Sequence, residues 1–221
     1  SHSYSLSTGN TNTEPFVMSL GISLGTMAVD CFFFMSGFLV CASLLRQQNL
    51  FSFFWARFFR IIPGLFVVVM LTVFALGPWL TTLSSADYFR HSATTEYLLH
   101  CITLVNDVAF VLPGVFDQNP FRQSVNGSLW SLPYEIGMYG ILMALWAVSY
   151  VLERINLKKA WPYLLVAMMT GFVGWMITDY ARQGYISTFP KLGFIFFWGV
   201  CFYTFRERIV LSWWGLLGCV L

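Results

Sequence analysis

Apolar stretches about as long as a membrane is thick constrain this sequence more than any other feature. They lie at 28–45, 61–83, 129–152, 160–178 and 186–205, and another begins at 209. A helix rises about 1.5 Å per residue, so about 20 apolar residues cross a hydrocarbon core of about 30 Å. No stretch alternates apolar and polar residues with a period of two, which argues against a transmembrane barrel. The sequence therefore predicts an all-α, polytopic transmembrane helix bundle with about six to seven spans.

Composition supports a membrane protein and excludes several other classes. Of the 221 residues, 57% are apolar and only 10% are charged, whereas soluble domains are about 25% charged. This hydrophobicity excludes a disordered chain. The net charge is only +2 and is spread along the chain, so we expect no nucleic-acid partner. The five cysteines form no CxxC pair, so we expect neither a disulfide framework nor a metal site.

Basic residues indicate which connections between spans face the cytoplasm. Three connections carry them: Arg46 with Arg57 and Arg60, Arg154 with Lys158 and Lys159, and Arg206 with Arg208. Segments 3–20, 84–94, 117–128 and 179–185 are then expected to face outward. An even number of crossings must separate Arg60 from Arg154. Segment 97–116, which Pro113 and Gly114 interrupt, is therefore not expected to cross fully, and two shorter crossings are the alternative.

The two ends of the chain suggest a single, incomplete transmembrane domain over residues 1–221. No leader with a basic segment precedes the first apolar stretch. The last apolar stretch, from 209 to 221, is too short to span a bilayer. We therefore expect that part of the first helix and further C-terminal helices are missing.

Ionisable side chains inside apolar stretches are candidates for function, because each costs about 2.5–3.5 kcal/mol to insert. Asp30, Asp107 and Glu135 are of this kind. Asp30 is expected to open a helix, where it would complement the helix dipole or pair with an arginine. Glu135 is expected about one turn below the outer surface, near Asn126 and Trp130. There it could serve as a base, a proton carrier or a cation partner, and a structural hydrogen bond is the alternative.

Two arginines and one histidine extend this set. Arg57 and Arg60 are three residues apart and share a helix face. The enrichment of positive residues in cytoplasmic connections explains both arginines. A site that binds phosphate through bidentate arginines is the alternative. Pro63 is expected in the first turn of the following span. His2 is predicted at the same leaflet as Glu135, where an imidazole and a carboxylate could form a general base.

Small residues and helix-capping residues indicate how the spans pack and begin. Ser36 and Gly37 allow two helices to approach closely, and packing explains them best. Ser128 or Ser131 can cap the helix that carries Glu135.

Three stretches, in this order, resemble the acyltransferase family 3 of membrane O-acyltransferases, which includes O-antigen and exopolysaccharide O-acetylases. They are VDCFFFMSGFL at 29–39, RFFRIIP at 57–63 and NGSLWSLPYE at 126–135. They are similar to the family patterns V-D-x-F-F-x-x-S-G-F-L, R-x-x-R-I-x-P and N-x-S-L-W-S-L-x-x-E. The resemblance covers about residues 1–140, and the remaining segments agree only in being apolar.

The resemblance implies an enzyme that moves an acyl group, acetyl by family frequency, from cytoplasmic acyl-CoA to a hydroxyl of an extracytoplasmic sugar or glycan. Acyl-CoA would be a co-substrate, and no bound cofactor is implied. The location implied is the bacterial inner membrane, with a lipopolysaccharide or another polysaccharide as the modified molecule. The implied roles are His2 as general base or acyl carrier, Glu135 as its support, Arg57 and Arg60 as ligands of the CoA phosphates, and Asp30, Ser36, Asn126 and Trp130 as supporting or acceptor-site residues.

A multi-span transporter or flippase is the main alternative. It would account for the break at Pro113 and Gly114, for Asp107, and for a GxxxG pattern at Gly21 and Gly25. No pair of interrupted segments occupies corresponding halves of the chain, which argues against it. A purely structural membrane subunit is a third interpretation.

Overall fold

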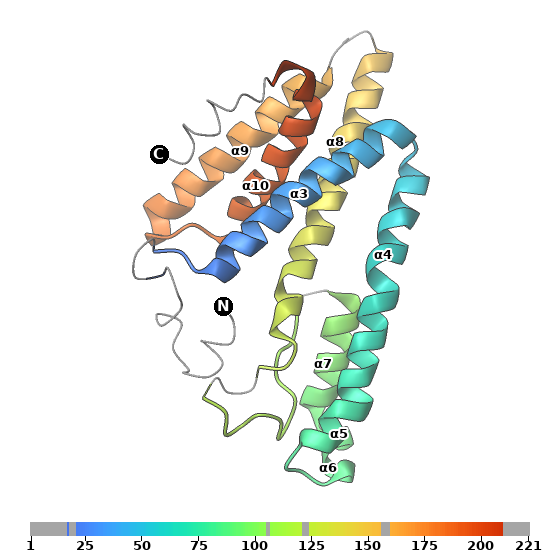
Figure 1. Cartoon of the computed structure of the whole chain (residues 1–221), viewed down its shortest axis with the longest axis vertical. Coiled ribbons are helices and arrows are strands. Elements are labelled where there is room, and N and C mark those ends of the chain that lie inside the picture. The colour runs from blue at the N-terminus through green and yellow to red at the C-terminus, as the bar shows by residue number, and fades with distance from the viewer. Residues whose placement is uncertain (1–16, 18–20, 105–106, 121–123, 156–159, 210–221) are drawn as a thin grey trace. The chain divides into compact units, whose positions relative to one another are not determined.

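The computed structural model describes residues 17, 21–104, 107–120, 124–155 and 160–209. Every secondary-structure element within these residues is helical, so the predicted all-α class is confirmed (Figure 1). The elements are α3 (Leu24–Gln47), α4 (Leu50–Leu71), the π-helical turn η2 (Thr72–Leu76), α5 (Gly77–Leu80), α6 (Ser85–Arg90), α7 (Ser92–Thr103), the 3-10 turn η3 (Gly127–Ser131), α8 (Leu132–Arg154), α9 (Ala160–Gln183), α10 (Thr188–Thr204) and the 3-10 turn η4 (Arg206–Arg208).

The helices make the chain a multi-pass membrane protein. Four helical stretches in the described part of the chain are long and apolar enough to span: Leu24–Gln47, Leu50–Leu80, Gly127–Arg154 and Ala160–Gln183. α10 has 17 residues, which makes it about 25 Å long and slightly shorter than a hydrocarbon core. Four spans are therefore identified where the sequence suggests about six to seven.

The chain packs into two compact units. Unit 1 comprises Ser1–Val29 and Asn49–Gly137, and unit 2 comprises Asp30–Gln48 and Met138–Leu221. In unit 1, α7 packs against α4 and α6 packs against α7 (Figure 1). One cluster of buried side chains in unit 1 contains Leu65, Val69, Val73, Tyr88, Tyr97, Cys101, Val108, Leu112, Val115 and Val125.

The second span starts earlier than predicted. Asn49 caps α4, because its side-chain oxygen accepts hydrogen bonds from the backbone N–H groups of Phe51 and Ser52 at 3.0 and 3.2 Å. Pro63 consequently lies inside the helix and not in its first turn. Farther along, Pro78 lacks the N–H group that a regular helix would use, and the preceding turn η2 is π-helical. The whole helical stretch is 31 residues long, or about 46 Å.

The segment between α5 and η3 agrees with the prediction that 97–116 does not cross fully. α7 has only 12 residues, which is about 18 Å. After it, the chain folds back onto the end of α5. The hydroxyl of Thr81 donates to the carbonyl of Pro113 at 2.8 Å, and the N–H of Thr82 donates to the carbonyl of Gly114 at 3.0 Å. Gly114 has a φ of +72°, and a Cβ there would overlap the Thr81 hydroxyl.

Unit 2 is built on close helix packing. α9 and α10 lie side by side (Figure 1). A Cβ at Gly37 of α3 would overlap the carbonyl oxygen of Phe196 in α10, and a Cβ at Gly199 of α10 would overlap that of Phe34 in α3. Glycine at both positions therefore allows the two backbones to touch, which confirms the packing role predicted for Gly37.

One end of unit 2 gathers arginines from several connections. Thr204, the last residue of α10, lies 3.9 Å from the sulfur of Cys41 in α3 and accepts a hydrogen bond from the indole N–H of Trp161 in α9 at 3.2 Å. The ends of α3 and α10 and the start of α9 therefore meet. Arg46 lies in the last turn of α3, and Arg206 directly follows α10. Within unit 2, these two residues thus share one end, as their predicted cytoplasmic location requires.

Candidate functional site

A cavity in unit 1 brings together residues from two of the three family-like stretches. It measures about 240 Å³ and lies between α4 and the start of α8. Arg60 and Glu135 both line it, and Gly64, Leu65, Leu129 and Leu132 supply apolar or small surfaces. Glu135 is buried, with 4% of its surface exposed, whereas Arg60 is exposed. The cavity therefore combines a buried carboxylate with a cation that solvent or a ligand can reach.

This geometry corrects the predicted placement of Arg60 and Glu135 at opposite membrane faces. Two residues that line one cavity of about 240 Å³ lie close together. Arg60 lies ten residues beyond Leu50, so it is about 15 Å along the helix and not in the connection before it.

Arg57 lies one turn before Arg60 on α4, as the spacing predicted. Its guanidinium carbon is 5.5 Å from the centre of the Phe53 ring, which is fully buried. The arginine thus packs its planar group on an aromatic face of its own helix. This contact directs the Arg57 side chain toward the turn of α4 that precedes it.

Asn126 fixes the turn that leads into α8. Its side-chain amide donates hydrogen bonds to the hydroxyls of Thr72 and Tyr97 at 2.6 and 3.2 Å. Burial raises the pKa of the Tyr97 phenol, so this hydroxyl stays protonated and accepts from the amide. Asn126 also has a φ of +53°, a conformation that asparagine tolerates better than most residues. Its structural role is therefore to join η3 to η2 and α7.

The remaining residues of this stretch build the first turn of α8. Trp130 lies in η3, and its ring meets the ring of Tyr134 edge to face, with centroids 5.9 Å apart. Pro133 is the second residue of α8, so its first-turn position is confirmed. Ser128 and Ser131, the predicted caps, lie within the 3-10 turn itself.

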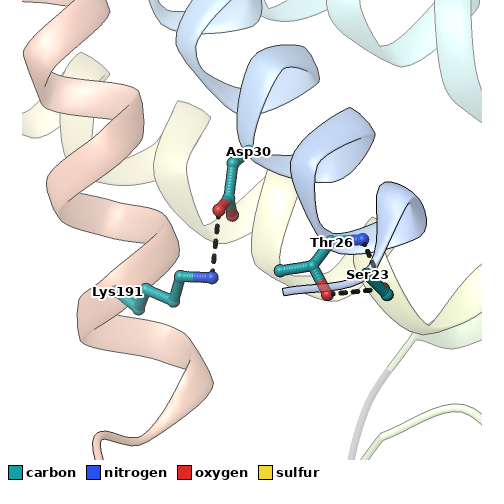
Figure 2. A network of polar contacts seen from close by, with 4 residues as sticks. All are labelled: Ser23, Thr26, Asp30 and Lys191. Atoms are coloured by element: carbon teal, nitrogen blue, oxygen red, sulfur yellow. Dashed lines mark hydrogen bonds and ion pairs between the residues drawn. The ribbon is translucent and has the colours of Figure 1, made fainter. Parts of the chain in front are cut away.

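Asp30 lies in unit 2 and forms an ion pair. Its Oδ2 is 3.0 Å from Nζ of Lys191 in α10, and Figure 2 shows the two side chains pointing toward each other. Asp30 does not open the helix, because α3 begins at Leu24. A Ser23 hydroxyl that accepts from the N–H of Thr26 at 3.1 Å marks that start. The partner of Asp30 is thus a lysine and not the predicted arginine. Sequence reasoning overlooked it, because Lys191 lies within an apolar stretch.

Ser36 is also held within unit 2. It is buried, and its hydroxyl shares a hydrogen bond of 3.0 Å with the hydroxyl of Tyr139 in α8. Together with the backbone contact at Gly37, this bond ties α3 to its neighbours. The buried hydroxyl of Ser36 therefore has a hydrogen-bond partner, as buried polar groups in packed helices require.

His2 lies outside the described residues, so its predicted proximity to Glu135 stays a prediction. Sequence reasoning missed four structural partners: Lys191 of Asp30, Tyr139 of Ser36, and Thr72 and Tyr97 of Asn126. Only Lys191 carried a usable signal, since a lysine within an apolar stretch requires a partner.

Comparisons with known proteins identify the family of this chain. The profile of the acyltransferase domain family, acyltransferase family 3, matches residues 1–221. The chain is 32% identical over 139 residues to an O-acetyl transferase of Shigella phage Sf6. The match covers 63% of this chain and 39% of the relative, so the chain spans about two fifths of the relative's length. No solved structure is similar. The match along its whole length shows that the chain belongs to the acyltransferase family 3.

Proposed function

We propose that the full protein transfers an acyl group from cytoplasmic acyl-CoA to a hydroxyl of an extracytoplasmic sugar or glycan. The name of the phage relative supports acetyl as the group. One observation supports the proposal most: Arg60 and Glu135, from two family-like stretches, line the same cavity. A bacterial inner membrane, with lipopolysaccharide or another surface polysaccharide as acceptor, is part of this proposal.

The proposed reaction is an acyl transfer from sulfur to oxygen. The acceptor hydroxyl oxygen attacks the thioester carbonyl carbon, a new C–O bond forms and the C–S bond breaks. A base takes the hydroxyl proton, and the CoA thiolate leaves and is protonated to the thiol. Positioning this base within hydrogen-bond reach accelerates the step by about 10²–10⁴-fold.

The proposed roles follow from these requirements. His2 takes the proton of the acceptor, or first accepts the acyl group itself. Glu135 orients His2 and stabilises its protonated form, as a carboxylate does for a catalytic imidazole. Arg57 and Arg60 bind anionic groups of acyl-CoA, because guanidinium groups match phosphate in a bidentate manner.

The test uses the full-length protein with His2→Ala, and His100→Ala on α7 as the matched control. Purified protein receives acetyl-CoA and an extract of surface glycans from cells that lack the gene. Free thiol and acetylated glycan are then measured, the latter by mass spectrometry. We expect His2→Ala to lose both products while it inserts into membranes like the wild type. Near wild-type transfer by His2→Ala would contradict the role of His2.

The same preparation separates the enzyme from the transporter alternative. An acyltransferase releases free CoA and forms an ester on the acceptor. Uptake of a glycan precursor into vesicles without thiol release would favour a transporter or flippase instead.

A further inference from the structure

Unit 2 contains a second cavity, which the proposed mechanism leaves without a role. It measures about 490 Å³, within the range of about 300–1,000 Å³ typical of small-molecule sites. Its walls come from the end of α3, the last turns of α8 and the first turn of α9. This is the end of unit 2 where Arg46 and Arg206 lie.

The walls of this cavity are aromatic and held in place. Trp146 and Tyr150 of α8 stack on each other, with ring centroids 5.5 Å apart and planes 15° apart. Trp161 of α9 donates its indole N–H to Thr204 at 3.2 Å, which fixes the ring. All three rings line the cavity. Flat aromatic surfaces that are held in place are the kind of surface on which nucleobases stack.

Polar groups lie between these rings. Gln48, Ser149 and Glu153 line the same cavity. The hydroxyl of Ser149 donates to Oε1 of Glu153 at 3.2 Å, which orients the carboxylate. A carboxylate accepts hydrogen bonds and donates none, so it favours a ligand that carries a hydrogen-bond donor such as an amino group.

An arginine contacts one of the rings that line the cavity. Arg154 donates from Nη2 to the hydroxyl of Tyr150 at 2.6 Å, and its guanidinium carbon lies 5.1 Å from the centre of that ring. Arg46, in the last turn of α3, follows the lining residue Leu45. The ligand that fits is therefore planar and aromatic, has an amino group, and is attached to an anion.

We propose that this cavity binds the adenine ring of acyl-CoA, with the ring between the aromatic side chains and its amino group on Glu153. The proposal rests on the acyl-CoA donor of the proposed function. It assigns donor recognition to residues outside the three family-like stretches. A lipid headgroup is the competing occupant, but it offers no aromatic ring to stack on Trp146.

The test measures binding of adenosine bisphosphate, the nucleotide portion of CoA, to the full-length protein in lipid nanodiscs. Trp146→Leu removes a stacking surface. Glu153→Gln removes only the charge and keeps the shape of the side chain, so we expect this second variant to fold like the wild type. The matched control is Trp175→Leu, a tryptophan of α9 that is 47% exposed. We expect each cavity variant to weaken binding about tenfold and the control to bind like the wild type. Inosine bisphosphate carries a carbonyl in place of the amino group, so it should bind the wild type more weakly than adenosine bisphosphate does, because a carbonyl cannot donate a hydrogen bond to Glu153.

The outcomes separate this inference from the proposed function. A wild-type protein that binds adenosine bisphosphate but transfers no acyl group would overturn the proposed function and leave the cavity assignment standing. Continued transfer by both cavity variants, with unchanged nucleotide binding, would overturn the cavity assignment alone. A phospholipid that native mass spectrometry finds on the wild type but not on Trp146→Leu, together with unchanged nucleotide binding, would assign the cavity to a lipid headgroup.

Discussion

Two carboxylates inside membrane helices meet different surroundings in the two units. Asp30, in unit 2, has a lysine 3.0 Å away, and its side chain is 28% exposed. Glu135, in unit 1, is 4% exposed and borders a cavity of about 240 Å³ that Arg60 also lines. Both lie in stretches that resemble the same family. The ion pair of Asp30 leaves little for it to do beyond holding α3 to α10, whereas Glu135 faces a volume that a substrate can enter.

This difference indicates two roles for charged residues within membrane helices. A paired charge stabilises a helix contact, and removal of its partner would leave an uncompensated charge. A carboxylate that lines a cavity can also contact a ligand there, and an ionisable group inside a membrane segment is by default a candidate for function. Membership of a family-like stretch does not distinguish the two uses, but the surroundings do.

The largest effect should come from exchanging each carboxylate for its amide. Glu135→Gln is expected to lower kcat at least about 100-fold, because the amide cannot stabilise a protonated base. Asp30→Asn should lower kcat far less and act on stability. Thiol release from acetyl-CoA measures the first effect and thermal unfolding in detergent the second. Equal losses of turnover in the two variants would break the comparison.

The next largest effect should come from Asn126, which holds the turn before Glu135. Asn126→Ala removes two hydrogen bonds and places alanine at positive φ, so we expect unit 1 to lose about 2–3 kcal/mol of stability. Asn126→Gly loses the same bonds without the backbone cost and should be less destabilised. Denaturant titration of both variants provides the measurement. Greater destabilisation by glycine than by alanine would contradict the backbone argument.

A smaller effect is expected at the partner of Asp30. Lys191→Met should destabilise unit 2 by about 1–2 kcal/mol, since the pair is partly exposed and solvent screens it. The double variant Asp30→Asn with Lys191→Met should recover part of this loss. A double-mutant cycle on unfolding free energies measures the coupling. Strictly additive effects would show that the ion pair contributes nothing.

The smallest effect should come from the hydroxyl pair in unit 2. Ser36→Ala and Tyr139→Phe each remove one partner of the same hydrogen bond, so each should cost about 1 kcal/mol. Their combination should cost less than the sum, because the second change removes nothing further. Hydrogen exchange of the α3 amides would measure the local loosening. A loss of acyl transfer with unchanged exchange would instead assign Ser36 to the acceptor site.

The sequence predicted much of the fold and part of the site. Apolar length alone located the main helices, and the break at Pro113 and Gly114 lies in a segment whose one helix, α7, has only 12 residues. The start of α4 was missed, because the cap is a single asparagine in a polar connection that also fits a loop. Arg60 therefore lies within α4 and not in the connection that precedes it. The two polar partners of Asn126 were unpredictable, since Thr72 and Tyr97 are far from it in sequence and each is unremarkable in its own segment.

By itself, the sequence determined the class of the protein, because burying apolar residues in a bilayer depends on composition and length and hardly on partners. It also determined the family, through short stretches whose residues are read in order. Only the tertiary structure decided what each charge faces. Contacts such as Asp30 with Lys191, or Arg60 and Glu135 around one cavity, join helices distant in sequence. They depend on how those helices pack, and no local pattern encodes that.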